Sequence, residues 1–309
     1  MRAVFFGTAE VACPSLKLLS ERHEVSLVIT QPDRPAGRKG RLRQAPVKLQ
    51  ADKLGLNVAQ PVSINSEVGL TLLNEAAPDV IVVVAYGQIL RQQVFTLPPL
   101  GTINIHASLL PKYRGAAPIN WAIINGETET GVSSFLIEAG VDTGNILLQR
   151  AIPIGMDETA GELHARLAVL GAQVLLDTLA GLETETIHPR VQHPAAGTAA
   201  PKLTRETGRI NWGKDAKAIH NQVRGMNPWP GAFTYLGKRR VKIHRTKLTG
   251  IARGQLTPGR VRQPESDQQL LVATADNLLQ ILEIQPQGHR CMSGRDFLNG
   301  RHGQPTSFS

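Results

Sequence analysis

Cysteine is scarce in this sequence, with two residues in a chain of 309. Cys13 and Cys291 are far apart, and neither has a second cysteine nearby. This usage favours neither a disulfide framework nor a zinc site. We expect free thiols in a reducing, cytoplasmic compartment.

Long hydrophobic runs and metal-binding histidine spacings are also missing. No apolar run reaches the roughly 18 residues of a membrane-spanning helix. The opening MRAVFFGTAE is apolar too briefly for a signal peptide and is typical of a first strand. The nine histidines show no H-x-x-x-H or H-x-H spacing, so we predict no metal site and no membrane partner.

Acidic residues are few in the C-terminal third. From Thr207 to the end there are 16 Lys and Arg against 6 Asp and Glu, whereas residues 1–206 carry 18 against 19. Lys and Arg gain affinity by releasing counterions from phosphates, so the asymmetry points to a nucleic acid partner. A domain that is basic without binding RNA explains the charge alone equally well.

The first 180 residues alternate short apolar runs with helical patterns. This alternation predicts an α/β domain with a doubly wound, mostly parallel, Rossmann-like sheet. We expect strands at residues 3–6, 25–30, 80–85, 102–107 and 132–137, and helices at 14–20, 46–54 and 66–76. A further long helix follows Thr159, which forms a T-x-x-E capping box with Glu162, and should end at Gly181.

A proline-rich stretch separates this domain from a second one. We expect a catalytic domain at residues 1–185, a linker at 186–206 and a basic domain at 207–309. After a helix at 216–223, short strands are expected at 232–236, 240–246, 254–261, 270–273 and 278–283. Five short strands favour a small β-barrel, like the oligonucleotide-binding (OB) fold, although another barrel fits the same count.

Three polar residues of the first domain are candidates for chemistry. Asn104 and His106 alternate with isoleucines and so share one face near the end of a strand. Asp142 lies in the glycine-flanked turn EAGVDTGN, and adjacent parallel strands could bring it to the same edge. An amide and a charged imidazole are donors for an oxyanion, and a carboxylate orients the imidazole. Structural hydrogen bonding is the alternative role.

Covalent and redox catalysis have little support. The sequence has no G-x-S-x-G, and its single D-T-G at Asp142 lacks the second carboxylate of aspartic proteases. Gly7 and the residues after it lack most of the dinucleotide fingerprint G-x-G-x-x-G. We therefore expect acyl transfer to a nucleophile that the substrate supplies.

Residues 31–48, QPDRPAGRKGRLRQAPVK, form a second unusual segment. Its basic residues are Arg34, Arg38, Lys39, Arg41, Arg43 and Lys48, against Asp33 alone. Loops of this length are usually functional or disordered, and contact with phosphates would order this one. A solvated flexible loop is the alternative.

Several motifs carry a resemblance to known enzymes. NIHASLLPKYRGAAPINWAI and VDTG are similar to the signature of enzymes that use 10-formyl-tetrahydrofolate. QPDRPAGR, AYGQIL, RGMNPWPGA and GRDFLNG extend the match along nearly the whole chain to the family of methionyl-tRNA formyltransferases. The resemblance implies a formyltransferase-type sheet followed by an OB-like tRNA-binding domain. It also implies formyl transfer from 10-formyl-tetrahydrofolate to initiator methionyl-tRNA.

The resemblance also implies roles for individual residues. The catalytic set is Asn104, His106 and Asp142, and the folate-contacting set is Ser108, Leu109, Leu110, Pro111, Gln88, Ile89, Leu90 and Val141. The tRNA-contacting set is Arg34, Arg38, Lys39, Arg41 and Arg43. We expect a monomer without a metal. A formyltransferase for a nucleotide or sugar amine and a non-catalytic RNA-binding protein remain the alternatives.

Overall fold

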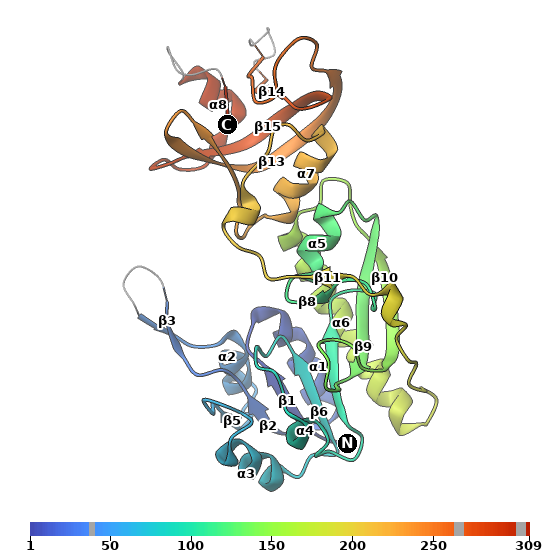
Figure 1. The fold of residues 1–309 in the computed structure, drawn as a ribbon. Helices are drawn as coiled ribbons and strands as arrows, with labels where there is room; N and C mark the ends of the chain where they lie inside the picture. The colour runs from blue at the N-terminus through green and yellow to red at the C-terminus, as the bar shows by residue number, and fades with distance from the viewer. Residues whose placement is uncertain (37–40, 263–268, 301–306) are drawn as a thin grey trace. The chain divides into compact units, whose positions relative to one another are not determined.

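The computed structural model describes residues 1–36, 41–262, 269–300 and 307–309 (Figure 1). The chain forms two compact units. Unit 1 comprises Met1–Gly115, Thr130–Ile152 and His164–Ala199, and unit 2 comprises Ala116–Glu129, Pro153–Leu163 and Ala200–Ser309. The chain therefore passes between the units more than once.

Unit 1 is built on a seven-stranded sheet with the order β10-β9-β7-β6-β1-β2-β5. The strands are β1 Arg2–Gly7, β2 Glu24–Ile29, β5 Val58–Ala59, β6 Val80–Val84, β7 Thr102–His106, β9 Glu129–Leu136 and β10 Ile146–Pro153. The strands β5, β2, β1, β6 and β7 pair in parallel, whereas β9 is antiparallel to β7. The mostly parallel sheet is confirmed, but the expectation of a parallel neighbour for β7 at residues 132–137 is wrong.

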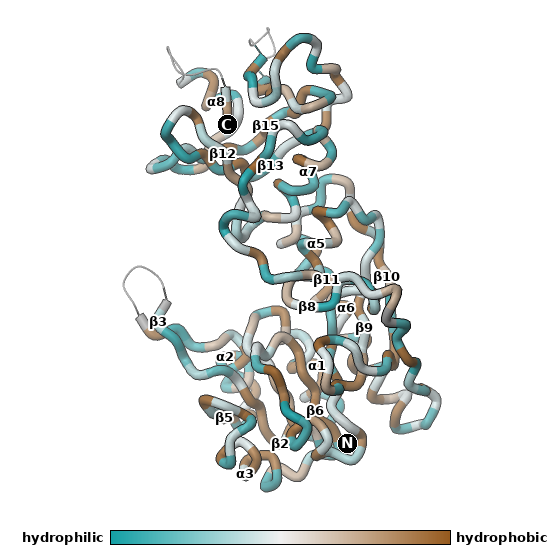
Figure 2. Tube along the Cα trace, in the orientation of Figure 1, coloured by the Kyte–Doolittle hydropathy of each residue, from teal (hydrophilic) through white to brown (hydrophobic). Residues whose placement is uncertain are grey.

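Helices cover both faces of this sheet (Figure 1). They are α1 Cys13–Arg22, α2 Pro46–Lys53, α3 Glu67–Ala76, α4 Gln92–Phe95 and α6 Ala160–Glu183. Because side chains alternate along β1, Ala3 and Phe5 share a core with α1, α2 and α6, and Val4 and Phe6 share another with α3 and α4. The strands stand out as hydrophobic in Figure 2.

The helix α6 begins with the expected capping box. The Thr159 amide donates to Glu162 Oε2 at 2.8 Å, and the Glu162 amide donates to Thr159 Oγ1 at 3.3 Å. The helix continues past Gly181, so its expected end there is wrong. Within the described residues, α6 is the one helix long and apolar enough to cross a membrane. Its Leu175 and Leu179 are fully buried in the core of unit 1, which is the position of a core helix.

The basic segment after β2 contains a two-stranded hairpin. Strands β3 Arg34–Ala36 and β4 Arg41–Arg43 pair antiparallel and extend from the sheet of unit 1 (Figure 1). We expected a loop without strands here, which is wrong for the paired residues. The sequence did not reveal these strands because they are short and charged and lack the usual strand pattern. At the base, Asp33 accepts hydrogen bonds from Lys48 Nζ at 3.0 Å and Gln60 Nε2 at 2.8 Å.

Unit 2 contains an antiparallel sheet. Its strands are β12 Ala232–Leu236, β13 Arg239–Ala252, β14 Leu271–Ala273, β15 Asn277–Pro286 and β16 Met292–Ser293, and its helices are α5 Pro118–Ile124, α7 Ala216–Gly225 and α8 Gly294–Asn299. The remaining short elements of the chain are η1 Glu10–Ala12, β8 Arg114–Gly115, η2 Pro194–Ala196, β11 Ala199–Ala200 and η3 Glu206–Gly208.

Isolated bridges connect the two outer strands of this sheet. Leu236 in β12 pairs with Phe308, Ser307 pairs with Arg260, and Val261 pairs with Val272 in β14. These bridges connect the edge strands β12 and β14 through residues 307–308 and 260–261, so the sheet closes on itself as expected for a barrel. The strand expected at 254–261 is wrong, because Gly254 and Gly259 have φ values of 62° and 85° and form turns.

Candidate active site and RNA-binding surfaces

His106 and Asp142 lie together at the carboxyl end of β7. The His106 side chain is buried, and its Nε2 donates to the carbonyl oxygen of Tyr113 at 2.9 Å. Its Nδ1 is 3.6 Å from Asp142 Oδ2, so the two form an ion pair when the imidazole is protonated. The same carboxylate oxygen accepts the Gly115 amide at 2.7 Å. The carboxylate is thus fixed between β7 and the end of β8.

The Asn104 amide differs from these two groups because it is unused. Asn104 is half-buried and precedes His106 by two residues, so both side chains leave the same face of β7. Its side chain has no hydrogen-bond partner among the residues that the structure describes. The site therefore contains an amide that can donate a hydrogen bond to an oxygen atom of a ligand.

Asp142 reaches this site through a reversal of the chain. Antiparallel pairing puts Ser133 beside His106 and Leu136 beside Ile103, so β9 runs away from the carboxyl end of β7. The loop after β9 must return, and Asp142 within it has a φ of 52°. The sequence indicated that Asp142 and His106 meet, but the route through adjacent parallel strands was wrong.

The turn after β7 is held by the side chains expected to contact folate. Ser108 Oγ donates to the Lys112 carbonyl at 2.6 Å, and Ser133 Oγ donates to the Ser108 carbonyl at 2.7 Å. The Leu110 side chain is buried against Phe135. These groups shape the turn, and their side chains are not presented to a ligand.

The neighbouring Leu109 and Pro111 are half-buried. A Cβ on Gly131 of β9 would lie 2.6 Å from the Leu109 side chain, so Leu109 packs closely over β9. A larger residue at Gly131 would clash with the backbone carbonyl of Arg150 as well as with Leu109.

The segment after β6 presents one apolar side chain outward. Gln88 accepts from the Ile64 amide and donates to the Val62 carbonyl, each at 3.0 Å, and Leu90 is buried. Ile89, in contrast, is 79% exposed, and Val141 in the Asp142 loop is 61% exposed. Within the expected folate set, these two side chains offer apolar surface to a flat aromatic group.

Tyr86 is a buried polar residue at this edge that the sequence did not single out. Its hydroxyl has no partner among the described residues, and burial raises the pKa of Tyr86 to about 12. The Thr8 hydroxyl donates to the Tyr86 carbonyl at 2.8 Å and accepts the Gln31 amide at 3.3 Å. Thr8 thereby connects the carboxyl ends of β1, β2 and β6. No local sequence pattern predicts this contact.

The hairpin places like charges opposite one another. Arg34 pairs with Arg43 across β3 and β4, an arrangement that repels unless an anion lies between the side chains. Arg34 also donates to Gln31 Oε1 at 3.2 Å. Of the remaining expected contacts, Arg38 and Lys39 lie outside the described residues, and only the backbone of Arg41 is described.

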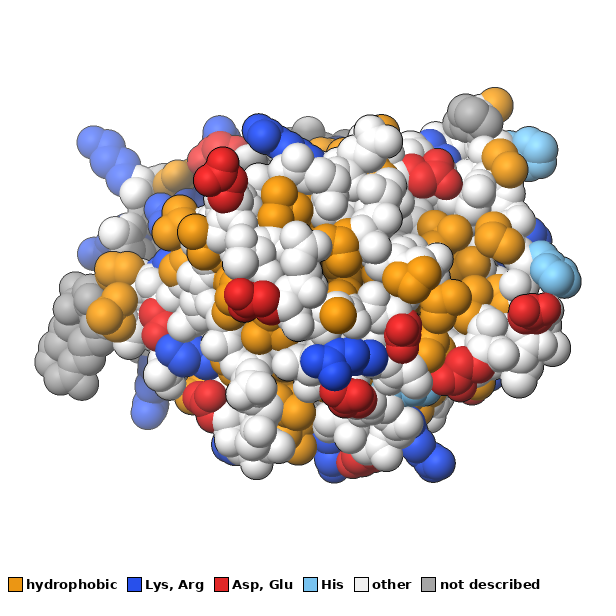
Figure 3. Space-filling model, turned by 90° about the horizontal axis from the view of Figure 1, so that it is seen from below, with side chains coloured by type: hydrophobic (Ala, Val, Ile, Leu, Met, Phe, Trp, Pro, Cys, Tyr) orange, Lys and Arg blue, Asp and Glu red, His pale blue; other side chains and the backbone are white. Residues whose placement is uncertain are grey.

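The outer face of β12 and β13 combines cations with aromatic rings. The Arg240 guanidinium lies 3.7 Å from the centroid of Phe233, and that of Arg209 lies 5.9 Å from Tyr235. Phe233 is only 2% exposed, so this face offers cations to an RNA but not the Phe233 ring. On the face drawn in Figure 3, by contrast, acidic and basic side chains are interspersed.

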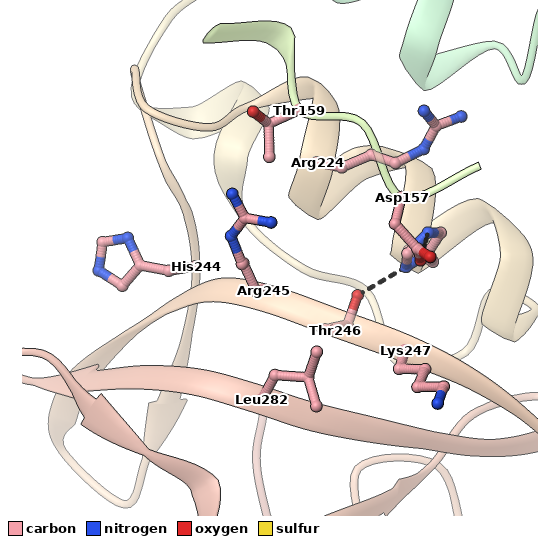
Figure 4. A pocket seen from close by; sticks show the side chains of 9 residues that line it. Asp157, Thr159, Arg224, His244, Arg245, Thr246, Lys247 and Leu282 are labelled. Atoms are coloured by element: carbon pink, nitrogen blue, oxygen red, sulfur yellow. Dashed lines mark hydrogen bonds and ion pairs between the residues drawn. The ribbon is translucent and has the colours of Figure 1, made fainter. Parts of the chain in front are cut away.

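A pocket in unit 2 is lined by Arg224, Arg245 and Lys247, and the two arginines are bonded internally (Figure 4). Arg245 on β13 donates to Glu162 Oε1 at 2.6 Å. Arg224 on α7 donates to the carbonyls of Gly155 and Glu158 at 3.1 Å, and burial lowers its pKa. Burial also lowers the pKa of His220. No group of three or more His, Cys, Asp or Glu that could hold a metal occurs in the described part of the chain.

Comparison with known families agrees with this geometry. The formyl transferase family model matches residues 1–179, and that of the formyl transferase C-terminal domain matches residues 202–302. A solved N-formyltransferase from Helicobacter canadensis, in complex with folinic acid and dTDP-3-aminofucose, is 21% identical, with a TM-score of 0.68 over 91% of this chain and 98% of that one. Fold and site thus define a formyl transferase.

Relatives of higher identity show which kind of formyl transferase this chain resembles. A methionyl-tRNA formyltransferase from Solibacter usitatus is 47% identical over 97% of this chain and 96% of its own length. Another from Citrifermentans bemidjiense is 45% identical over 99% of this chain and 95% of its own length. The chain belongs to the methionyl-tRNA formyltransferase family.

Proposed function

We propose that the protein transfers the formyl group of 10-formyl-tetrahydrofolate to the α-amino group of methionine on initiator tRNA. The observation that carries this proposal is the unused Asn104 amide on the same strand face as the His106–Asp142 pair. Family membership supports the choice of acceptor. The exposed side chains of Ile89 and Val141 offer the kind of apolar surface that a pterin ring contacts.

Asn104 stabilises the charge that develops during transfer. When the neutral amine attacks the formyl carbon, the formyl oxygen becomes an oxyanion, and the amide donates a hydrogen bond to it. His106 adds a positive charge nearby when it is protonated. Both ring nitrogens of His106 already face protein groups. Asn104 is therefore the donor that can bind the oxyanion without first breaking a contact within the protein.

Asp142 transfers a proton from the attacking amine to the leaving nitrogen of the folate. Its carboxylate is held by the Gly115 amide and faces His106, which leaves it able to take the proton that the amine loses. It returns this proton to the nitrogen that leaves with the folate, so the charges balance. The substrate amine is the nucleophile, and no serine or cysteine is required.

Two basic surfaces would hold the acceptor RNA. The β3–β4 hairpin of unit 1 carries Arg34 and Arg43, and the outer face of β12 and β13 carries Arg240. Contacts from these side chains to phosphates would supply affinity without reading bases. We also propose that the protein acts as a monomer in the cytoplasm, as expected from its sequence.

One assay tests the function. The protein is mixed with a formyl donor labelled in its one-carbon group and with methionyl initiator tRNA, and label is sought on the esterified methionine. Transfer to the tRNA is expected. Label found on a nucleotide or sugar amine instead, or RNA binding without transfer, would replace the proposal with one of its alternatives.

A further inference from the structure

Gln192 lies beside the Asp142 loop and is 4% exposed. Its Nε2 donates to the carbonyl of Asp142 at 3.0 Å and to that of Gly144 at 2.7 Å. Its Oε1 accepts from Nε and Nη2 of Arg114 at 3.1 and 2.7 Å. Both ends of the carboxamide are therefore bound to segments that meet at the catalytic carboxylate.

The backbone at Asp142 needs such support. A φ of 52° is uncommon for a residue with a Cβ, and such a conformation persists where the surroundings determine it. Gln192 holds the carbonyls on both sides of Thr143, which fixes the turn. The Asp142 side chain is then left to face His106.

The second contact of Gln192 completes this arrangement. Arg114, which binds its oxygen, immediately precedes Gly115, whose amide donates to Asp142 Oδ2. One buried side chain thus joins the backbone of the Asp142 turn to the segment that binds the Asp142 carboxylate.

We propose that Gln192 is a positioning residue for formyl transfer, which holds the Asp142 turn in register with His106 and Gly115. This inference rests on the proposed function of the site. Gln192 need not touch the substrate, and it acts through Asp142. It belongs to the segment 186–206, expected from its composition to be a linker.

Unit 2 offers a matched control. Gln222 in α7 also donates from Nε2 to two backbone carbonyls, those of Thr207 and Arg209, each at 2.9 Å. Gln192→Met and Gln222→Met each remove two hydrogen bonds donated to backbone carbonyls, with little change in side-chain length. Gln192→Met also removes the acceptor for Arg114. Both variants should lose stability, whereas only the first should lose turnover.

Misplacing a catalytic group can cost on the order of 100-fold in rate, so we expect kcat of Gln192→Met to fall roughly 10- to 100-fold. The KM values for both substrates should change less than about threefold, because binding is not what is lost. Turnover of Gln192→Met equal to that of Gln222→Met would overturn the inference.

A double-mutant cycle separates positioning from general damage. In an Asp142→Asn background, Gln192→Met should lower kcat little further, because the group it positions is already disabled. An equally large fall in both backgrounds would show that Gln192 does not act through Asp142, which would also overturn the inference.

Two further measurements keep the test decisive. If Gln192→Met does not fold, Gln192→Glu is used in the same cycle, since it keeps the acceptor for Arg114 but has no donors. Crystal structures of wild type and variant should show Asp142 displaced from His106, and an unmoved carboxylate would contradict positioning. The position of Asp142 in these crystal structures can be compared without any substrate. A wild-type protein inactive in the formylation assay would therefore refute the proposed function, while the structures would still test whether Gln192 positions Asp142.

Discussion

Each unit contains a buried histidine beside an aspartate, and the two pairs have different surroundings. In unit 1, His106 Nδ1 is 3.6 Å from Asp142 Oδ2, and the Asp142 side chain is 13% exposed. In unit 2, His220 Nε2 is 3.4 Å from Asp157 Oδ1, and the Asp157 side chain is 71% exposed. The residue types alone do not distinguish a catalytic site from a structural one.

The hydrogen bonds around each pair do distinguish them. His220 Nδ1 is bonded to Thr246 Oγ1 at 2.9 Å, and its Nε2 donates to the Met156 carbonyl at 3.1 Å. Arg245 is paired with Glu162. Beside His106, the Asn104 amide has no partner in the described part of the chain. A fully satisfied network stabilises a fold, whereas a spare donor is available to a ligand.

The comparison depends most on Asn104. Asn104→Ala should lower kcat about 100- to 1,000-fold, the usual cost of one oxyanion donor, and leave tRNA affinity nearly unchanged. Steady-state kinetics with methionyl initiator tRNA, together with a binding titration, measure both quantities.

A satisfied amide provides the control. Asn120 Nδ2 donates to the Gly225 carbonyl at 2.7 Å within unit 2, so Asn120→Ala should reduce stability but not turnover. If Asn104→Ala kept nearly normal turnover, the distinction between spare and satisfied donors would not hold.

His220 tests the other side of the comparison. His220→Leu leaves Thr246 and the Met156 carbonyl without this partner, so the free energy of unfolding should fall by about 1 to 3 kcal/mol at pH 8, with kcat unchanged. Urea unfolding and the formylation assay measure the two effects. A large loss of kcat in the folded variant would mean that the His220 cluster is functional.

The pH dependence of stability provides a second test of His220. Burial lowers its pKa from the ordinary 6.5, so the unfolded chain binds the proton more readily than the folded one. Stability is therefore full above pH 6.5 and falls as the pH drops below it. His220→Leu should reduce this slope, and an identical slope in both proteins would contradict the assignment.

The regular elements were predictable because their signals are local. Helix α3 follows Ser66, whose Oγ accepts the Gly69 amide at 3.3 Å, as a serine N-cap does. β12 was expected at residues 232–236 and has those bounds. Hydrophobic period and caps act within a few residues, so one sequence is enough to detect them.

The features that complete the site depend on distant residues. A strand has the same period of two in parallel and antiparallel pairs, so the pattern at 132–137 could not show the direction of β9. Gln192 bonds to Asp142, 50 residues away, and lies in a segment whose composition is typical of a linker. The positive φ of Asp142 likewise could not be predicted from the residue type, because aspartate adopts such values more often than most residues but still usually has a negative φ.

The hairpin arginines should produce a smaller, electrostatic effect. Arg34→Ser with Arg43→Ser should weaken tRNA binding several-fold and reduce the salt dependence, by roughly 0.7 to 0.9 in log–log slope per lost phosphate contact. The exposed Arg22 at the end of α1 is a control outside the hairpin. Binding titrations between low and high salt measure the slope, and an unaltered slope would exclude the hairpin from the RNA interface.

Glu162 should produce the smallest effect, because it belongs to the satisfied network of unit 2. The Thr159 amide, followed by Arg245, lowers the pKa of Glu162 from 4.5 to about 2. Its stabilising contribution is present above pH 4.5 and is lost as the pH falls toward 2. With 49% of the side chain exposed, Glu162→Gln should cost less than about 1 kcal/mol at pH 7. Unfolding of both proteins across this range should show the difference vanishing at the acid end. A difference independent of pH would mean that packing, and not charge, links Glu162 to Arg245.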